Sequence, residues 1–128
     1  MVTPVTLQLG LNAVVELVVT EADTAIALRS GDVPVIGTPR LLALFEEATM
    51  QAMAGHLPEG QSTVGMRVQV EHISPTAVGG TSRAEATLDK IEGRRLAFTV
   101  SACDQSGLIG AGKITRVLID VERFMSGI

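Results

Sequence analysis

The segment 38–55 constrains the fold more than any other part of the chain, because it predicts one long and almost entirely apolar helix. Thr38 is a good N-cap residue, Pro39 suits the first helical position, and Gly55 supplies a stop. At about 100° per residue the polar side chains form only a narrow line, which consists of Arg40, Glu47 and Gln51. A helix with so narrow a polar line is expected to be enclosed by other elements.

Alternating apolar and polar residues downstream of this helix predict the strands that enclose it. The expected strands cover 62–74, 82–91, 96–102 and 108–121, and a β-rich run at 11–20 precedes the helix. In the strand 62–74, strict alternation puts one set on a buried face: Val64, Met66, Val68, Val70 and His72. Short connections require antiparallel neighbours, so the sequence predicts an α+β fold in which one long helix and a curled sheet bury each other.

Composition excludes several classes of function. At 128 residues with 46% hydrophobic content, the chain is expected to form a single domain, 1–128. A net charge of −4 and an aromatic content of 2% argue against a nucleic-acid partner, which needs basic patches or stacking platforms. The single cysteine, Cys103, excludes an internal disulfide and a metal site built from several thiolates. With neither a signal-peptide pattern nor an apolar stretch of about 20 residues, the expected location is cytoplasmic, away from membranes.

Two polar residues of the helix are candidates for a functional site. Glu46 lies about 100° around the helix from Glu47, so only Glu47 joins the polar line. On the flank of the apolar face, an ionised Glu46 needs a hydrogen-bond partner or contact with solvent. Thr38 is expected to accept a backbone N–H as the N-cap, and it lies eight residues before Glu46, about 12 Å along the axis. The hydroxyl and the carboxylate could therefore border one groove.

His72 and Arg116 are the basic candidates. His72 ends the apolar face of its strand just before a turn at Ser74 and Pro75, where a side chain can leave the core for a pocket. Arg116 lies among apolar neighbours of the last strand, where a guanidinium needs a carboxylate, a phosphate or carbonyl groups. A lone histidine in such a place is more often structural than catalytic, whereas for Arg116 a structural ion pair explains the position as well as a binding role does.

Taken in order, these segments resemble the hot-dog-fold thioesterases, and within them the fluoroacetyl-CoA thioesterase-like group. The resemblance spans about 37–124, and its motifs are FEEATMQAMAGHL after Thr38, VGMRVQVEH ending in His72, IEGRRLAFTVSA, and GAGKITRVLIDVERF containing Arg116. It implies a long helix wrapped by an antiparallel sheet of five to six strands. It also implies a homodimer or tetramer with subunits paired edge to edge and acyl-CoA sites at the interface.

The resemblance further implies the residues of the site. The family's catalytic threonine, glutamate and histidine match Thr38, Glu46 and His72. For substrate binding, Gly65 matches a glycine whose backbone lies against the thioester, and Arg116 matches an arginine that braces the site.

Coenzyme A is expected as part of the substrate, with no separate cofactor and no metal. The exposed Arg94 and Arg95 are candidates for contact with its phosphates, and Arg116 is a third. No nucleic acid or membrane partner is expected.

The expected function is that of an acyl-CoA thioesterase, which hydrolyses a thioester to a free acid and CoA, with the acyl group unassigned. Selectivity for a fluorinated acyl group is not expected, because the family's fluoroacetyl-selective member covers its acyl pocket with aromatic side chains and segment 21–37 contains none. A non-catalytic acyl-CoA-binding protein, acting as a sensor or carrier, is the alternative. A hydratase on the same fold is a weaker reading, because its upstream aspartate has no match in 64–71.

Overall fold

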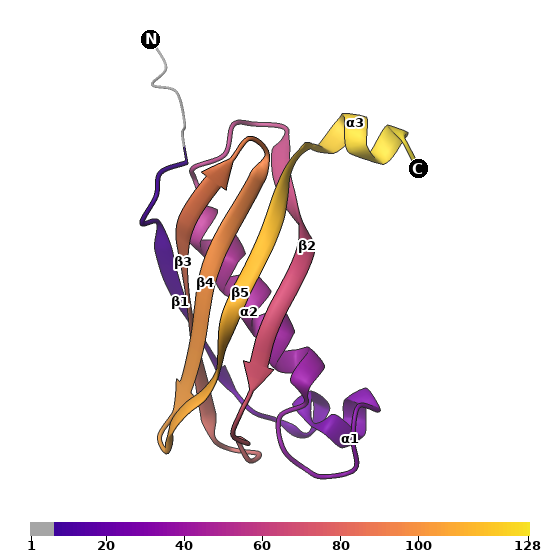
Figure 1. Ribbon diagram of the computed structural model, residues 1–128. Helices are drawn as coiled ribbons and strands as arrows, with labels where there is room; N and C mark the ends of the chain where they lie inside the picture. Colours follow the sequence, from indigo (N-terminus) through magenta and orange to yellow (C-terminus); the bar gives the residue numbers. More distant parts are fainter. Residues whose placement is uncertain (1–6) are drawn as a thin grey trace.

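The computed structural model describes residues 7–128, which form one long helix against a five-stranded antiparallel sheet (Figure 1). The strands lie in the order β1-β3-β4-β5-β2, so β1 and β2 are the two edges. The elements are β1 (Asn12–Val18), η1 (Glu21–Asp23), α1 (Ala25–Leu28), α2 (Thr38–Met53), β2 (Gln61–His72), β3 (Thr81–Glu92), β4 (Arg95–Asp104), β5 (Gly107–Asp120) and α3 (Val121–Ser126). The predicted α+β class and the order of its elements are confirmed.

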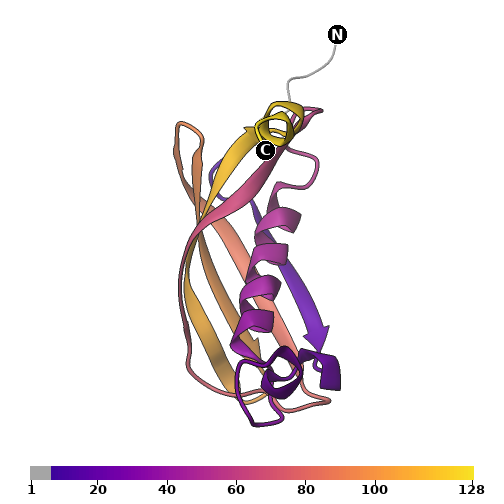
Figure 2. The same cartoon turned by 90° about the vertical axis from the view of Figure 1, so that its right-hand side faces the viewer.

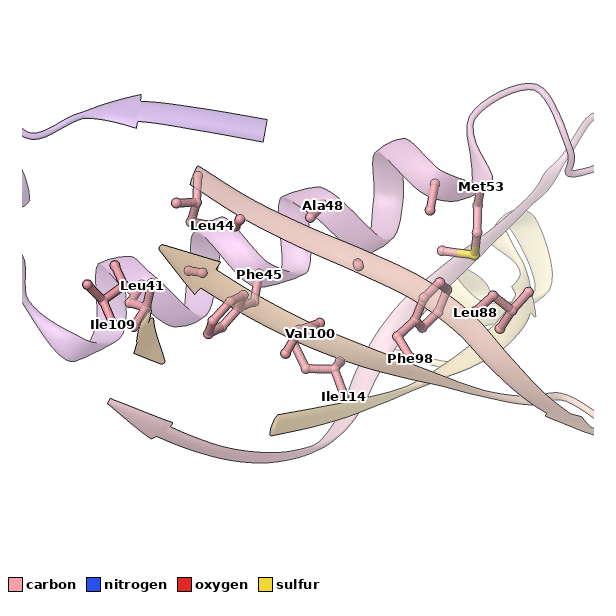
Figure 3. Packing of buried hydrophobic residues seen from close by; sticks show 14 of the residues in the cluster. Leu41, Leu44, Phe45, Ala48, Met53, Leu88, Phe98, Val100, Ile109 and Ile114 are labelled. Carbon is pink, nitrogen blue, oxygen red and sulfur yellow. The ribbon is translucent and has the colours of Figure 1, made fainter. Parts of the chain in front are cut away.

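The sheet curves around one face of α2 (Figure 2). The opposite face is exposed along Ala43, Glu47, Met50 and Gln51, so the enclosure predicted from the narrow polar line is only partial. Apolar side chains from the helix and from the concave face of the sheet form one core (Figure 3). Its largest fully buried members include Leu41, Leu44 and Phe45 of α2, Leu88 of β3, Phe98 and Val100 of β4, and Ile114 of β5. At about 1.5–3 kcal/mol for each such side chain, this burial is what holds the helix in the sheet.

A β-bulge at Met66 changes the faces of β2. The register against β5 shifts by one residue directly after Gly65, which pairs with Arg116. Because Arg116 is buried on the side of the sheet that holds α2, Gly65 faces the helix as well. The prediction of one alternating face from Val64 to His72 is therefore wrong, since the extra residue reverses the alternation and turns Val64 to the outside.

The start of α2 also differs from its prediction. Gly37 is the N-cap, in an extended conformation and without a side-chain cap, and Thr38 is the first helical residue. Both residue types are acceptable N-caps, and here the backbone carbonyl of Gly37 accepts the first intrahelical hydrogen bonds. The hydroxyl of Thr38 is therefore not used for capping.

The segment between β1 and α2 contains only the short helices η1 and α1, and isolated bridges connect it to neighbouring segments. Residues 35–37 pair on two sides: Ile36 forms an isolated bridge with Thr24, and Val35 forms one with Ala77.

None of the helices described in residues 7–128 is long and apolar enough to cross a membrane.

Candidate active site

Thr38 and His72 form the first contact of the site. The hydroxyl oxygen of Thr38 lies 2.8 Å from Nδ1 of His72, which ends β2. His72 faces α2 because it pairs with Gly110 of β5, where an added Cβ would lie 3.0 Å from a methyl group of Leu41 in the helix. The pair thus connects the first residue of α2 to the last residue of β2.

The second ring nitrogen of His72 has no partner among the described residues. Nε2 is buried and has no hydrogen-bond partner within residues 7–128. A buried polar atom without a partner costs free energy, and in a native protein it needs an explanation such as a ligand, water or a catalytic role. Since Nδ1 is engaged with the hydroxyl of Thr38, Nε2 is the atom that can exchange a proton with a bound molecule.

Glu46 and Arg116 form the second contact of the site. Nη1 of Arg116 donates to Oε2 of Glu46 at 3.1 Å, and a Cβ added at Gly65 would lie only 2.6 Å from the same oxygen. A side chain at that point of β2 would displace the carboxylate from its present position. Oε1 of Glu46 has no protein hydrogen bond in the described chain, and the side chain is 40% exposed, so one carboxylate oxygen is free.

Arg116 is held on its other side by Thr63. Nε donates to the hydroxyl of Thr63 at 2.8 Å, and Nη2 donates to its carbonyl at 3.0 Å. Burial lowers the pKa of the Arg116 guanidinium, and the charge and hydrogen bond of Glu46 oppose this effect. With a side chain only 8% exposed and its donors directed at Glu46 and Thr63, Arg116 braces the carboxylate from within the fold.

The five predicted site residues thus fall into two groups along one side of α2. Thr38 meets His72, while Glu46 meets Arg116 and Gly65. Eight residues of helix, about 12 Å, separate the two groups. A cleft shared by Glu46 and His72 stays a prediction.

Sequence analysis did not identify the roles of three polar residues near the site, which are Thr63, Asp23 and Arg40. Thr63 was missed because the bulge turns it toward the helix, against the alternation of the sequence. Asp23 and Arg40 form a partly buried ion pair, with Nε of Arg40 3.0 Å from Oδ1 of Asp23. A signal for Asp23 was present, since Thr20 and Asp23 match the spacing of a capping box.

No group of three or more histidine, cysteine, aspartate or glutamate side chains within residues 7–128 is arranged to hold a metal ion. Cys103 is exposed. The chemistry on this surface is that of an imidazole, a carboxylate and a hydroxyl.

An antiparallel sheet curled around one long helix is the hot-dog fold, and the match to a family model places the chain among the thioesterases of this fold. The model of the fluoroacetyl-CoA-specific thioesterase family, FlK, matches residues 19–122. The chain belongs to this family.

Three individual proteins illustrate the likeness. A fluoroacetyl-CoA thioesterase from Streptantibioticus cattleyicolor is 38% identical over 90 residues, which cover 70% of this chain and 65% of that protein, just under two thirds of its length. A solved structure of an FlK variant in complex with acetyl-CoA has a TM-score of 0.89 at 30% identity, covering 94% of this chain and 96% of that one. A hot-dog-like protein from Thermanaerovibrio acidaminovorans shares the fold, with a TM-score of 0.86 at 24% identity over 93% of this chain and 88% of its own.

Proposed function

We propose that this protein hydrolyses the thioester bond of an acyl-CoA to give a free acid and CoA. One observation carries the proposal: Glu46 and His72 each have one polar atom bonded to the protein and one, Oε1 and the buried Nε2, without a hydrogen-bond partner in residues 7–128. Thioester hydrolysis needs a nucleophile, an acceptor for its proton, and donors that stabilise the oxyanion. The membership in the family, and the acetyl-CoA bound to the FlK variant, support this assignment.

Glu46 can act by either of two routes. In the first, its carboxylate takes a proton from a water molecule, which attacks the thioester carbonyl and displaces CoA. In the second, the carboxylate itself attacks, so that CoA leaves as a thiolate and water then hydrolyses the resulting anhydride. In both routes Arg116 holds the carboxylate in place, and backbone amides near Gly65 stabilise the oxyanion.

His72 and Thr38 serve the other end of the same reaction. Nε2 of His72 passes the proton released by the water molecule to the thiolate of CoA, while the hydroxyl of Thr38 orients the ring through Nδ1. The phosphates of CoA are bound outside this centre. Arg94 and Arg95, at the exposed turn between β3 and β4, stay candidates for that contact, whereas the donors of Arg116 are engaged by Glu46 and Thr63.

The acyl group is proposed to be a short aliphatic chain. A hollow of about 200 Å³ beside His72 is lined by Val35, His72, Ile73, Ser74 and Pro75, with Ile73 54% exposed. Each methylene buried there should contribute about 0.8 kcal/mol, roughly fourfold in kcat/KM. Replacement of Ile73 by serine should flatten this dependence on chain length, and the same change at Val78, on the other side of Pro75, should not.

The active unit is proposed to be a homodimer formed through the edge of β2. This edge strand is 12 residues long, and it leaves Met66 43% and Val68 41% exposed. A long edge with apolar side chains is a template for pairing with another strand. Light scattering should give twice the chain mass of 13.4 kDa, and a stable, active monomer would contradict the dimer.

Incubation of the pure protein with acyl-CoAs from acetyl to long-chain, with detection of free thiol, tests the activity. We expect hydrolysis above the buffer rate, and no preference for fluoroacetyl-CoA over acetyl-CoA. If nothing is hydrolysed while several acyl-CoAs raise the melting temperature, the protein is an acyl-CoA sensor or carrier instead.

A further inference from the structure

Asp23, a residue distant in sequence from α2, fixes the start of this helix. Its backbone carbonyl accepts the N–H of Gly37 at 2.9 Å, and its carboxylate oxygen Oδ1 accepts Nε–H of Arg40 at 3.0 Å. Gly37 precedes Thr38 and Arg40 follows it in the first helical turn. Asp23 therefore holds the chain on both sides of the residue whose hydroxyl meets His72.

The carboxylate of Asp23 is itself fully engaged. Its second oxygen, Oδ2, accepts the backbone N–H of Thr20 at 2.8 Å and the hydroxyl of Thr20 at 2.9 Å. Burial raises the pKa of Asp23, but the hydrogen bonds from Thr20 and Arg40 outweigh it and bring the pKa below its usual value. The group is therefore an anion held in one orientation.

The first turn of α2 has no side-chain cap. The hydroxyl oxygen of a threonine at the start of a helix commonly accepts a hydrogen bond from a backbone N–H of the first turn. Here Gly37 is the N-cap, and the negative charge of Asp23 lies at the positive end of the helix, where it is favourable. The hydroxyl of Thr38 lies 2.8 Å from Nδ1 of His72 instead.

We propose that Asp23 and Arg40 are positioning residues for the reaction, acting through Thr38. Neither touches Glu46 or His72 in the hydrogen bonds of the described chain, so their effect must pass through the placement of the Thr38 hydroxyl. The inference rests on the proposed thioesterase function and deepens it. Small displacements of a positioned group reduce rates strongly, by about 100-fold for about 1 Å.

The first test is Asp23→Asn, which keeps the shape of the side chain and the backbone carbonyl but removes the charge. We expect kcat to fall about tenfold or more while KM changes less than twofold. Glu16→Gln is the matched control, because Glu16 also faces the Nε of an arginine, Arg83, at 3.7 Å, but on exposed β1. It should leave kcat unchanged, and an unchanged kcat in Asp23→Asn would overturn the proposal.

A double-mutant cycle separates positioning from general destabilisation. If Asp23 acts through Thr38, then Asp23→Asn should change kcat less than twofold in a Thr38→Ala background. An equal drop in both backgrounds would mean that the two residues act independently, which contradicts the proposal. Should Asp23→Asn fail to fold, Arg40→Gln enters the same cycle with the same expected outcomes.

A nuclear magnetic resonance readout keeps this inference distinct from the proposed function. If no acyl-CoA is hydrolysed, the proposed function fails, but the ¹⁵N signal of His72 Nδ1 still reports its hydrogen bond to Thr38. Asp23→Asn should shift that signal, and Glu16→Gln should not. Identical His72 signals in Asp23→Asn and the unchanged protein would overturn the positioning role.

Discussion

The two ends of the site are built in different ways. At one end, the carboxylate of Glu46 is held by Arg116, which is buried and bonded to Thr63 through two of its nitrogens. At the other end, the exposed hydroxyl of Thr38 makes one hydrogen bond with His72. The first end is fixed by charge and burial inside the sheet, and the second by the position of a helix terminus.

This difference teaches where the site can tolerate change. If the carboxylate of Glu46 moves away, the buried guanidinium of Arg116 loses its charged partner, which is costly. A hydroxyl with a single hydrogen-bond partner can be replaced by another hydroxyl at small cost. The Glu46 end should therefore be intolerant of small changes, whereas the Thr38 end should tolerate exchange for another hydroxyl as long as that hydroxyl keeps its position.

The largest effect is expected from Glu46→Gln. Loss of the carboxylate removes the base or nucleophile, so kcat should fall about 100-fold or more in steady-state hydrolysis of an acyl-CoA. Glu47→Gln is the matched control, because Glu47 is the adjacent carboxylate of α2 and is exposed on the polar line of this helix. Equal rates for Glu46→Gln and the unchanged protein would remove Glu46 from the mechanism.

Gly65→Ala should have the next largest effect. The added methyl group would lie 2.6 Å from Oε2 of Glu46, closer than van der Waals contact allows, so the carboxylate must move. We expect kcat to fall about tenfold to 100-fold, with the fold retained by circular dichroism. Full activity in this variant would show that the Glu46 end is more adaptable than its contacts indicate.

Thr38→Ser should lower kcat much less than Gly65→Ala does, and it tests the Thr38 end of the comparison. Serine retains the hydroxyl that meets Nδ1 of His72, so kcat should change by less than about fivefold. Thr38→Ala, which removes the hydroxyl, should cost more than Thr38→Ser when the two are assayed side by side. A Thr38→Ser variant as impaired as Gly65→Ala would erase the difference between the two ends.

The smallest effect concerns the pH dependence of stability at the Thr38 end. The pKa of Asp23 is lowered in the folded protein, so its carboxylate stabilises the fold above its unfolded pKa, near 3.8, and this contribution is lost as pH falls through the folded value. Asp23→Asn should lower the free energy of unfolding by about 1 kcal/mol at pH 7. In urea titrations, the difference in unfolding free energy between Asp23→Asn and the unchanged protein should shrink below about pH 4. A difference that does not depend on pH would contradict this role of the Asp23 charge.

The parts of the molecule that sequence could predict are those with a repeating pattern. The helix and the strands were predictable because their periods of 3.6 and 2 run over many residues. The bulge at Met66 was not, since one extra residue leaves the alternation in the sequence intact and appears only in the register against β5. Which face of the sheet Gly65 lies on could therefore be learned only from the structure.

The roles of Thr38 and Asp23 show a second limit. The hydroxyl of Thr38 finds its partner 34 residues away, and Asp23 reaches Arg40 across 17 residues. Local rules assign Thr38 to the N-cap because they consider only neighbours in the chain. Which partner a side chain takes is decided by tertiary packing, so the site residues could be named from sequence while their contacts could not.

The most direct test of the account is a crystal structure with a CoA ketone in which a methylene group replaces the thioester sulfur, since this analogue binds but cannot be hydrolysed. The account predicts the ketone oxygen at hydrogen-bond distance from the backbone near Gly65, with the carbonyl carbon between Glu46 and His72. A ketone bound away from both side chains, or Glu46 and His72 facing separate surfaces in the assembled protein, would contradict it.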